Sequence, residues 1–219
     1  MCTRSDLARC ALLLWLLGAG AALGNEIDAL VRDESGAPLA DAVVVAVADI
    51  PVKLPPPRLE SVVQESKEFK PFLKVVLVGT PVEFPNRDDV LHHVYSFSPA
   101  RAFELKVYAG TPPDPIVFDR PGPVALGCNI HDWMLAYIYV SESPYFSITG
   151  ADGHARLANL PAGRYSVRVW HYRLLQHESE TAQPVSFSGA GSVQVAWDLK
   201  LKRDSRVRRA PTRPGGGYR

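Results

Sequence analysis

The segment from residue 128 to residue 134 carries three soft metal ligands. It reads Cys-Asn-Ile-His-Asp-Trp-Met, so that a thiol, an imidazole and a thioether stand at Cys128, His131 and Met134. One more histidine would complete a set of two imidazoles, one thiolate and a weak axial thioether, which suits copper in electron transfer. His92 and His93, at the start of a predicted strand, are both available. The pattern therefore predicts a copper site made by these three residues and one of the two histidines.

Each part of this pattern has a simpler interpretation when it is taken alone. A buried cysteine is often only a small core residue, and a methionine such as Met134 more often packs in a core than binds a metal. The Cys-x-x-His spacing also occurs in zinc sites, but zinc would require further Cys, His or carboxylate donors. Asp132 is the only conspicuous one nearby, and a thioether is a poor zinc ligand. The complete set of donors favours copper.

The first 24 residues resemble a secretory signal peptide. They contain two arginines, a short apolar run over residues 11–17 and small residues before a cleavage site at Gly24. The apolar run is short for a membrane span, so we expect removal of residues 1–24 and export to the periplasm. Removal would take away Cys2 and Cys10 and leave Cys128 as the one thiol, so that no disulfide could form within the chain.

Composition points to an ordinary globular protein. The chain has 219 residues, of which 47% are apolar and 21% charged, and its net charge is +1. This balance gives no indication of nucleic-acid binding. Positive charge gathers near the C-terminus together with Pro and Gly, and we expect residues 201–219 to form a disordered basic tail. Docking to a partner or a membrane surface is the alternative for this tail.

Short β-branched and alternating runs separated by Gly- and Pro-rich turns predict an all-β fold, either a sandwich or a barrel. The 19 prolines argue against a long helix. The expected strands cover the ranges Ala42–Ala48, Lys74–Val78, His92–Phe97, Phe103–Val107, Leu135–Val140, Tyr165–Trp170 and Ser192–Leu199.

The two ends of the mature chain look like halves of one small sandwich. Residues 28–48 resemble the opening strands of a carboxypeptidase-regulatory-like β-sandwich, and residues 149–170 resemble its later strands. We therefore expect residues 25–57 and 143–200 to form this sandwich, with a second domain inserted over residues 58–142. Such insertions are tolerated at surface loops whose ends lie close together. The alternative is two consecutive domains preceded by an N-terminal arm.

Residues 62–140 resemble the cupredoxins. Within that family the short Cys-x-x-His-x-x-Met spacing of residues 128–134 is most similar to amicyanin. The resemblance implies a Greek-key β-sandwich, inserted in or flanked by the second sandwich, that holds one type 1 copper ion. The whole chain is similar to exported bacterial proteins often labelled methylamine utilization proteins, in which a cupredoxin accompanies a regulatory-like sandwich.

His92 and His93 alternate in direction on a strand, so only one of them can face the metal. The family resemblance favours His92, because the ligand histidine is usually followed by a polar residue and then Val, as in His92-His93-Val94. His93 would then replace the usual Asn, and its ring could bridge the two ligand-bearing loops. Burial of a face made by His93, Tyr95 and Phe97 would argue for His93 instead. We predict the ligand set His92, Cys128, His131 and Met134.

The ligand set implies an exported blue copper protein that carries single electrons and has no open coordination position for a substrate, and is therefore no enzyme. Its partners would be redox proteins such as a c-type cytochrome or a periplasmic dehydrogenase. The alternative is a copper-binding or partner- or glycan-binding assembly module without an electron-transfer role. Three other histidines, His154, His171 and His177, are expected at the surface or at strand edges. The aromatic residues Tyr145, Phe146, Trp170 and Tyr172 are expected to pack at a domain interface, and an aromatic surface that binds a ligand is the alternative.

Overall fold

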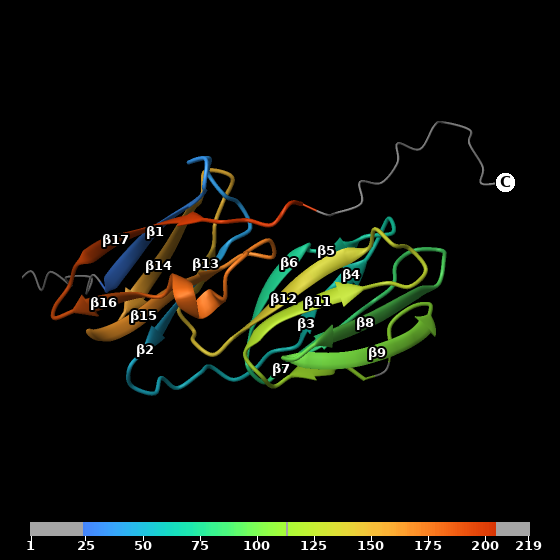
Figure 1. Cartoon of the computed structure of the whole chain (residues 1–219). Coiled ribbons are helices and arrows are strands. Elements are labelled where there is room, and N and C mark those ends of the chain that lie inside the picture. The colour runs from blue at the N-terminus through green and yellow to red at the C-terminus, as the bar shows by residue number, and fades with distance from the viewer. Residues whose placement is uncertain (1–23, 113, 205–219) are drawn as a thin grey trace, which may run out of the picture.

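The computed structural model describes residues 24–112 and 114–204, drawn in colour in Figure 1. This part of the chain is almost entirely β-structure, with one short 3-10 helix, η1 (Glu178–Thr181). The prediction of an all-β protein is confirmed. Most of the predicted signal peptide and of the basic tail lies outside the described residues. Within them, no helix is both long and apolar enough to span a membrane.

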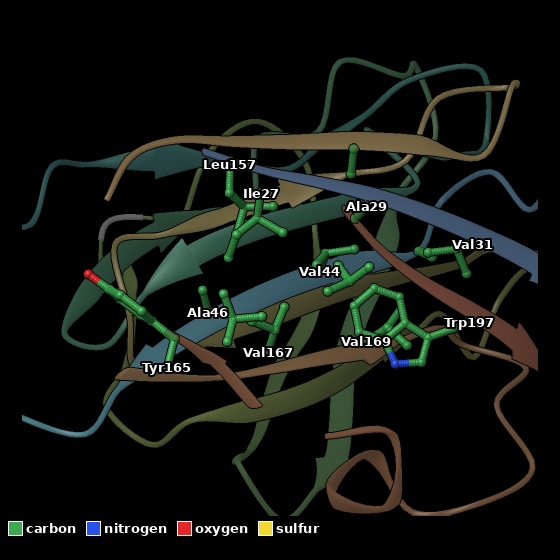
Figure 2. Close-up of a cluster of buried hydrophobic side chains, with 14 of the residues drawn as sticks. Ile27, Ala29, Val31, Val44, Ala46, Leu157, Tyr165, Val167, Val169 and Trp197 are labelled. Carbon is green, nitrogen blue, oxygen red and sulfur yellow. The ribbon is translucent and has the colours of Figure 1, made fainter. Parts of the chain in front are cut away.

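Strands from the two ends of the chain pair with one another in two sheets. One sheet has the order β14-β1-β17 and the other the order β13-β2-β15-β16. The side chains of Ile27, Ala29 and Val31, at alternate positions of β1, are fully buried between them (Figure 2), as expected for a strand with one face on a core. The bounds are β1 (Asn25–Asp33), β2 (Val43–Ala48), β13 (Phe146–Ile148), β14 (His154–Leu160), β15 (Gly163–Trp170), β16 (Gln183–Phe187) and β17 (Ser192–Leu199).

The middle of the chain forms a second group of sheets, with the orders β6-β12-β11-β8-β9, β10-β7-β3 and β4-β5. Their inner faces share a separate apolar core that includes Phe84, Phe118 and Leu126. The bounds are β3 (Glu60–Ser61), β4 (Val63–Gln64), β5 (Phe69–Lys70), β6 (Leu73–Leu77), β7 (Thr80–Glu83), β8 (His92–Ser98), β9 (Arg101–Tyr108), β10 (Ile116–Phe118), β11 (Gly122–Gly127) and β12 (Leu135–Ser141). Among the described strands, none of this group pairs with a strand of the first group. The boundaries near residues 57 and 142 stay a prediction.

The two groups of sheets meet through a third apolar cluster. Val43 and Val45 of β2 contribute to it. Val44, on the opposite face of β2, belongs to the core that lies between the sheets β14-β1-β17 and β13-β2-β15-β16. The sequence of β2 is continuously apolar because both of its faces are covered. Tyr139 and Trp170 complete the contact, with ring centroids 5.6 Å apart.

The prediction of interface packing is confirmed for Trp170, Phe146 and Tyr172, which belong to or pack against this third cluster. It is wrong for Tyr145, which packs against the core between the sheets β14-β1-β17 and β13-β2-β15-β16. The prediction that His171 lies at the surface is wrong. His171 is 2% exposed, its ring lies 4.3 Å from that of Tyr172, and its Nδ1 accepts a hydrogen bond from the Arg173 amide. Trp170, the last residue of β15, packs in the third cluster, and His171 follows it directly in the sequence.

A polar cluster adjoins the same interface. The Tyr139 hydroxyl donates a 2.5 Å hydrogen bond to the Glu178 carboxylate, and Arg168 forms ion pairs with Glu178 and Glu142. Burial, together with the nearby Glu178 charge, raises the pKa of Tyr139 well above its ordinary value. The hydroxyl therefore stays protonated and continues to donate to Glu178.

Candidate metal centre

The hairpin formed by β11 and β12 carries three of the predicted ligands on its loop. Gly127 pairs with Leu135 at the end of the ladder, so residues 128–134 form the connection between the two strands. The amide of Met134 donates to the His131 carbonyl at 2.9 Å and closes a turn within this loop. Cys128 is therefore fixed directly beyond the last pair of the β11–β12 ladder.

The fourth predicted ligand comes from the adjacent strand. β8 pairs antiparallel with β11 through Tyr95 and Gly127, and His92 begins β8. The ligand atoms of His92, Cys128 and His131 all lie within 4.8 Å of one another. The rings of His92 and His131 have centroids 4.9 Å apart. The structure thus brings together three of the four predicted ligands from two segments that are far apart in sequence.

Met134, the remaining predicted ligand, lies in the same core cluster as Cys128. It is 2% exposed, and Cys128 is 4% exposed. Its thioether is therefore held in an apolar environment close to the cysteine loop. Its part as an axial ligand stays a prediction.

His93 lies on the other side of β8, away from Cys128. Its Nε2 lies 2.9 Å from Glu104 Oε1, and its ring stacks near Tyr95 at 5.4 Å. His93 itself is 5% exposed, but the face opens along the strand, since Tyr95 is partly exposed and Phe97 is 86% exposed. The expected bridge from His93 to the ligand loops is not formed among the described residues, because Nε2 pairs with Glu104 on the neighbouring strand β9 and the buried Nδ1 has no hydrogen-bond partner there.

An irregularity in the β8–β9 ladder adjusts the strand at this point. The register shifts between His92 and Val94, which pair with Tyr108 and Leu105. Such a bulge changes the direction of nearby side chains.

The Tyr108 hydroxyl donates to the Phe84 carbonyl at 2.6 Å and accepts from Gln64 at 2.5 Å. Burial, with a smaller opposing effect of the Gln64 hydrogen bond, raises the pKa of Tyr108 to about 12.

Asp88 holds the outer edge of the His92 ring. Its Oδ2 lies 2.8 Å from His92 Nε2, and its carboxylate accepts hydrogen bonds from the amides of Ser66 and Lys67 at 2.6 and 2.8 Å. Burial alone would raise the pKa of Asp88, but the hydrogen bonds from Lys67, His92 and Ser66 together hold it below its ordinary value. Asp88 is therefore an ionised acceptor, which fixes the hydrogen of His92 on Nε2.

Asn86 fixes the loop that leads to His92. Its side-chain amide donates to the carbonyls of Val90 and Tyr108 at 2.8 and 3.1 Å, and its Oδ1 accepts from the Asp88 amide at 2.9 Å. The loop is thereby tied to β9, the strand that pairs with β8.

The donor set fits a soft transition metal. His92 Nδ1 is buried and has no hydrogen-bond partner within residues 24–112 and 114–204, so its lone pair can bind a metal. The thiol of Cys128 and the imidazole of His131 complete a His₂Cys arrangement, which suits copper. Asp132, the carboxylate that a zinc site would need, is exposed and is no member of the group.

The sequence alone did not identify Asp88 as a residue of the site. The four-residue spacing of Asp88 and His92 was the available signal, because a metal-binding histidine usually donates its other ring N–H to a carboxylate, a carbonyl or water. The spacing alone does not show whether the loop folds back onto the ring. That depends on the amides of Ser66 and Lys67, about twenty residues earlier.

Comparison with protein-family models and with curated proteins gives no match. Several solved structures resemble part of the chain. A purple cupredoxin from Nitrosopumilus maritimus is 20% identical over 37% of this chain and 99% of its own, with a TM-score of 0.33. A reduced single-residue variant of amicyanin is 19% identical over 37% of this chain and 80% of its own, with a TM-score of 0.34. The copper-containing nitrite reductase of Thermus scotoductus SA-01 is 22% identical over 52% of this chain, which spans only 28% of that enzyme, with a TM-score of 0.37.

Proposed function

We propose that this chain is an exported type 1 copper protein of the cupredoxin kind, which carries single electrons between redox partners. The observation that carries the proposal is the convergence of His92, Cys128 and His131, whose ligand atoms lie within 4.8 Å of one another in a largely buried site. Met134 is the proposed weak axial ligand. When bound, copper supplies a one-electron couple that these soft donors accommodate in both charge states.

The protein residues hold the donors in place. His92 is oriented by Asp88, and Cys128 is fixed by the end of the β11–β12 ladder. A site that keeps its shape needs little rearrangement when the metal changes charge, and this favours fast electron transfer. Burial of His92 and Cys128 excludes water from the thiolate side.

Two exposed apolar side chains stand next to the proposed ligand histidines in sequence. His131 is partly exposed, whereas Ile130 and Leu91, each next to a proposed ligand histidine, are 46% and 51% exposed. A redox protein such as a c-type cytochrome or a periplasmic dehydrogenase would dock there and exchange electrons through His131.

The second candidate is an assembly module in which copper is structural or carried for delivery. The apolar contact between the two groups of sheets is the observation that favours it, because a simple electron carrier needs only the sheets that hold the metal. Reversible redox cycling without loss of copper would count against this candidate.

Replacement of Cys128 by serine tests the proposal. The thiolate-to-copper absorption in the red should disappear, because serine provides no soft thiolate, while the circular dichroism of the strands should remain. Cys128→Ser protein that keeps the red band would overturn the proposal.

A further inference from the structure

The turn between β4 and β5 has an unusual backbone. Ser66 and Lys67 have φ angles of 60° and 59°, and the flanking residues Glu65 and Glu68 exchange amide-to-carbonyl hydrogen bonds of 3.0 and 3.2 Å. This is a two-residue hairpin turn of the type that normally selects Asn-Gly, because both central residues lie in the left-handed region. Ser and Lys adopt that region only at an energetic cost, so the surroundings must hold the turn in place.

One side of this turn contacts the His92 segment. The amides of Ser66 and Lys67 donate to the two carboxylate oxygens of Asp88, and Asp88 in turn lies against His92 Nε2. Two parallel amide contacts fix the plane of the carboxylate as well as its position. The left-handed conformation of both residues is what aims consecutive amides at one acceptor.

The other side of the turn contacts the cysteine loop. The carbonyl of Lys67 accepts a 3.1 Å hydrogen bond from the indole Nε1 of Trp133. The Trp133 ring lies 5.2 Å from the ring of His131, at a tilt of 56°. The turn therefore reaches the second histidine through one intervening aromatic ring.

The hairpin itself is anchored to the loop that precedes His92. The Gln64 amide donates to the Pro85 carbonyl at 2.8 Å, and the Arg87 amide donates to the Gln64 carbonyl at 2.9 Å. Gln64 is fully buried, and its side chain donates to the Phe84 carbonyl and to the Tyr108 hydroxyl. The turn thus follows a strand that is hydrogen-bonded to the loop before His92.

We propose that the Ser66–Lys67 turn is a positioning element that sets the relative placement of the two histidines, His92 through Asp88 and His131 through Trp133. The inference deepens the proposed function and rests on it for the assignment of both histidines as copper ligands. These residues touch no metal; they act through the side chains that they hold. In its left-handed conformation the turn presents two amides to Asp88 and a carbonyl to Trp133.

Two variants of the protein, each comprising residues 25–219, test the inference. Insertion of one glycine between Ser66 and Lys67 keeps the hairpin but breaks the two-residue turn, so that its amides and carbonyl move apart. The double substitution Ser66→Asn/Lys67→Gly is the matched control, because Asn-Gly favours the same turn and keeps every backbone donor and acceptor.

The first readout uses the metal-free protein. In the wild type and in the control, NMR should show a cross-peak between the rings of His92 and His131, together with slow exchange of the Trp133 indole N–H. In the insertion variant both signals should be lost, while the amide shifts of β6, β7 and β10, which belong to the same group of sheets as the site, stay unchanged as a check on folding. The second readout is copper affinity, which should fall about tenfold to a hundredfold in the insertion variant alone.

The outcomes separate the two proposals. An insertion variant with unchanged ring contact and unchanged copper affinity would overturn the positioning role. Loss of the ring contact in a protein whose wild type shows no red copper band would support the positioning of the two rings and overturn the proposed electron-transfer function. Loss of the ring contact or of copper affinity in the control variant would also contradict the inference. The control changes only the two side chains of the turn, so these side chains would then be what positions the rings.

Discussion

The Nε2 atom of His92 lies 2.8 Å from Oδ2 of Asp88. An ionised carboxylate only accepts hydrogen bonds, so a neutral His92 ring that donates to Asp88 carries its hydrogen on Nε2 and its lone pair on Nδ1. Nδ1 is the buried atom that lacks a hydrogen-bond partner among the described residues. The carboxylate therefore selects the tautomer in which His92 can bind a metal beside Cys128.

Removal of this carboxylate should weaken copper binding. Replacement of Asp88 by alanine frees the ring to rotate and to change tautomer, and we expect a loss of affinity of about tenfold to a hundredfold. A competition titration against a copper chelator measures it. Asp89→Ala is the matched control, since Asp89 is exposed. Equal affinities of the two variants would contradict a role for Asp88.

His92 and His93 should behave differently when each is replaced by alanine. His92→Ala removes a donor next to Cys128 and should abolish the red absorption band. His93→Ala removes only the contacts with Glu104 and Tyr95 and should leave the band in place. Absorption spectra of the two copper-loaded variants decide the matter, and the reverse pattern would make His93 the ligand.

Replacement of Met134 by leucine should raise the reduction potential and preserve the colour. The substitution conserves volume, so its effect on the free energy of unfolding should stay below about 1.5 kcal/mol. Loss of the thioether removes a donor that favours the more highly charged oxidised ion. Protein-film voltammetry gives the potential, and an unchanged value would show that Met134 is only a core residue.

The Tyr139 hydroxyl should make the protein sensitive to alkali. Since burial raises the pKa of Tyr139, the unfolded chain loses this proton near pH 10, about the ordinary tyrosine value, while the folded chain keeps it. Folding stability should therefore fall as the pH rises above that point. In Tyr139→Phe this part of the decline should be absent.

The same variant should cost about 1.5–3 kcal/mol at neutral pH, because the hydrogen bond to the charged Glu178 is lost. Urea unfolding of both proteins at several pH values provides the test. Parallel stability curves for the two proteins would contradict the account of Tyr139.

The sequence predicts β12 well although both of its faces are covered. Ala136 and Ile138 enter the core of the middle sheets, while Tyr137 and Tyr139 on the opposite face pack in the third apolar cluster. The predicted range Leu135–Val140 differs from the observed one by a single residue. The convergence of His92, Cys128 and His131 could also be predicted, because the resemblance to the cupredoxins implied a site made by one hairpin loop and one neighbouring strand.

The contacts around the ligands could not be predicted in the same way. The partners of Asp88 and Trp133 are backbone groups of Ser66 and Lys67, which any residue type could supply. Neither Ser nor Lys indicates a left-handed turn. The burial of His171 likewise depends on how the two groups of sheets pack, and local patterning does not contain that information.

An optical and EPR spectrum of the mature protein, after addition and oxidation of copper, tests the central claim most directly. We predict an intense red thiolate-to-copper band with narrow copper hyperfine splitting, because Cys128 lies against two imidazoles in a buried site. A colourless protein, or one that binds zinc as readily as copper, would contradict the electron-transfer account and leave the assembly module as the better proposal.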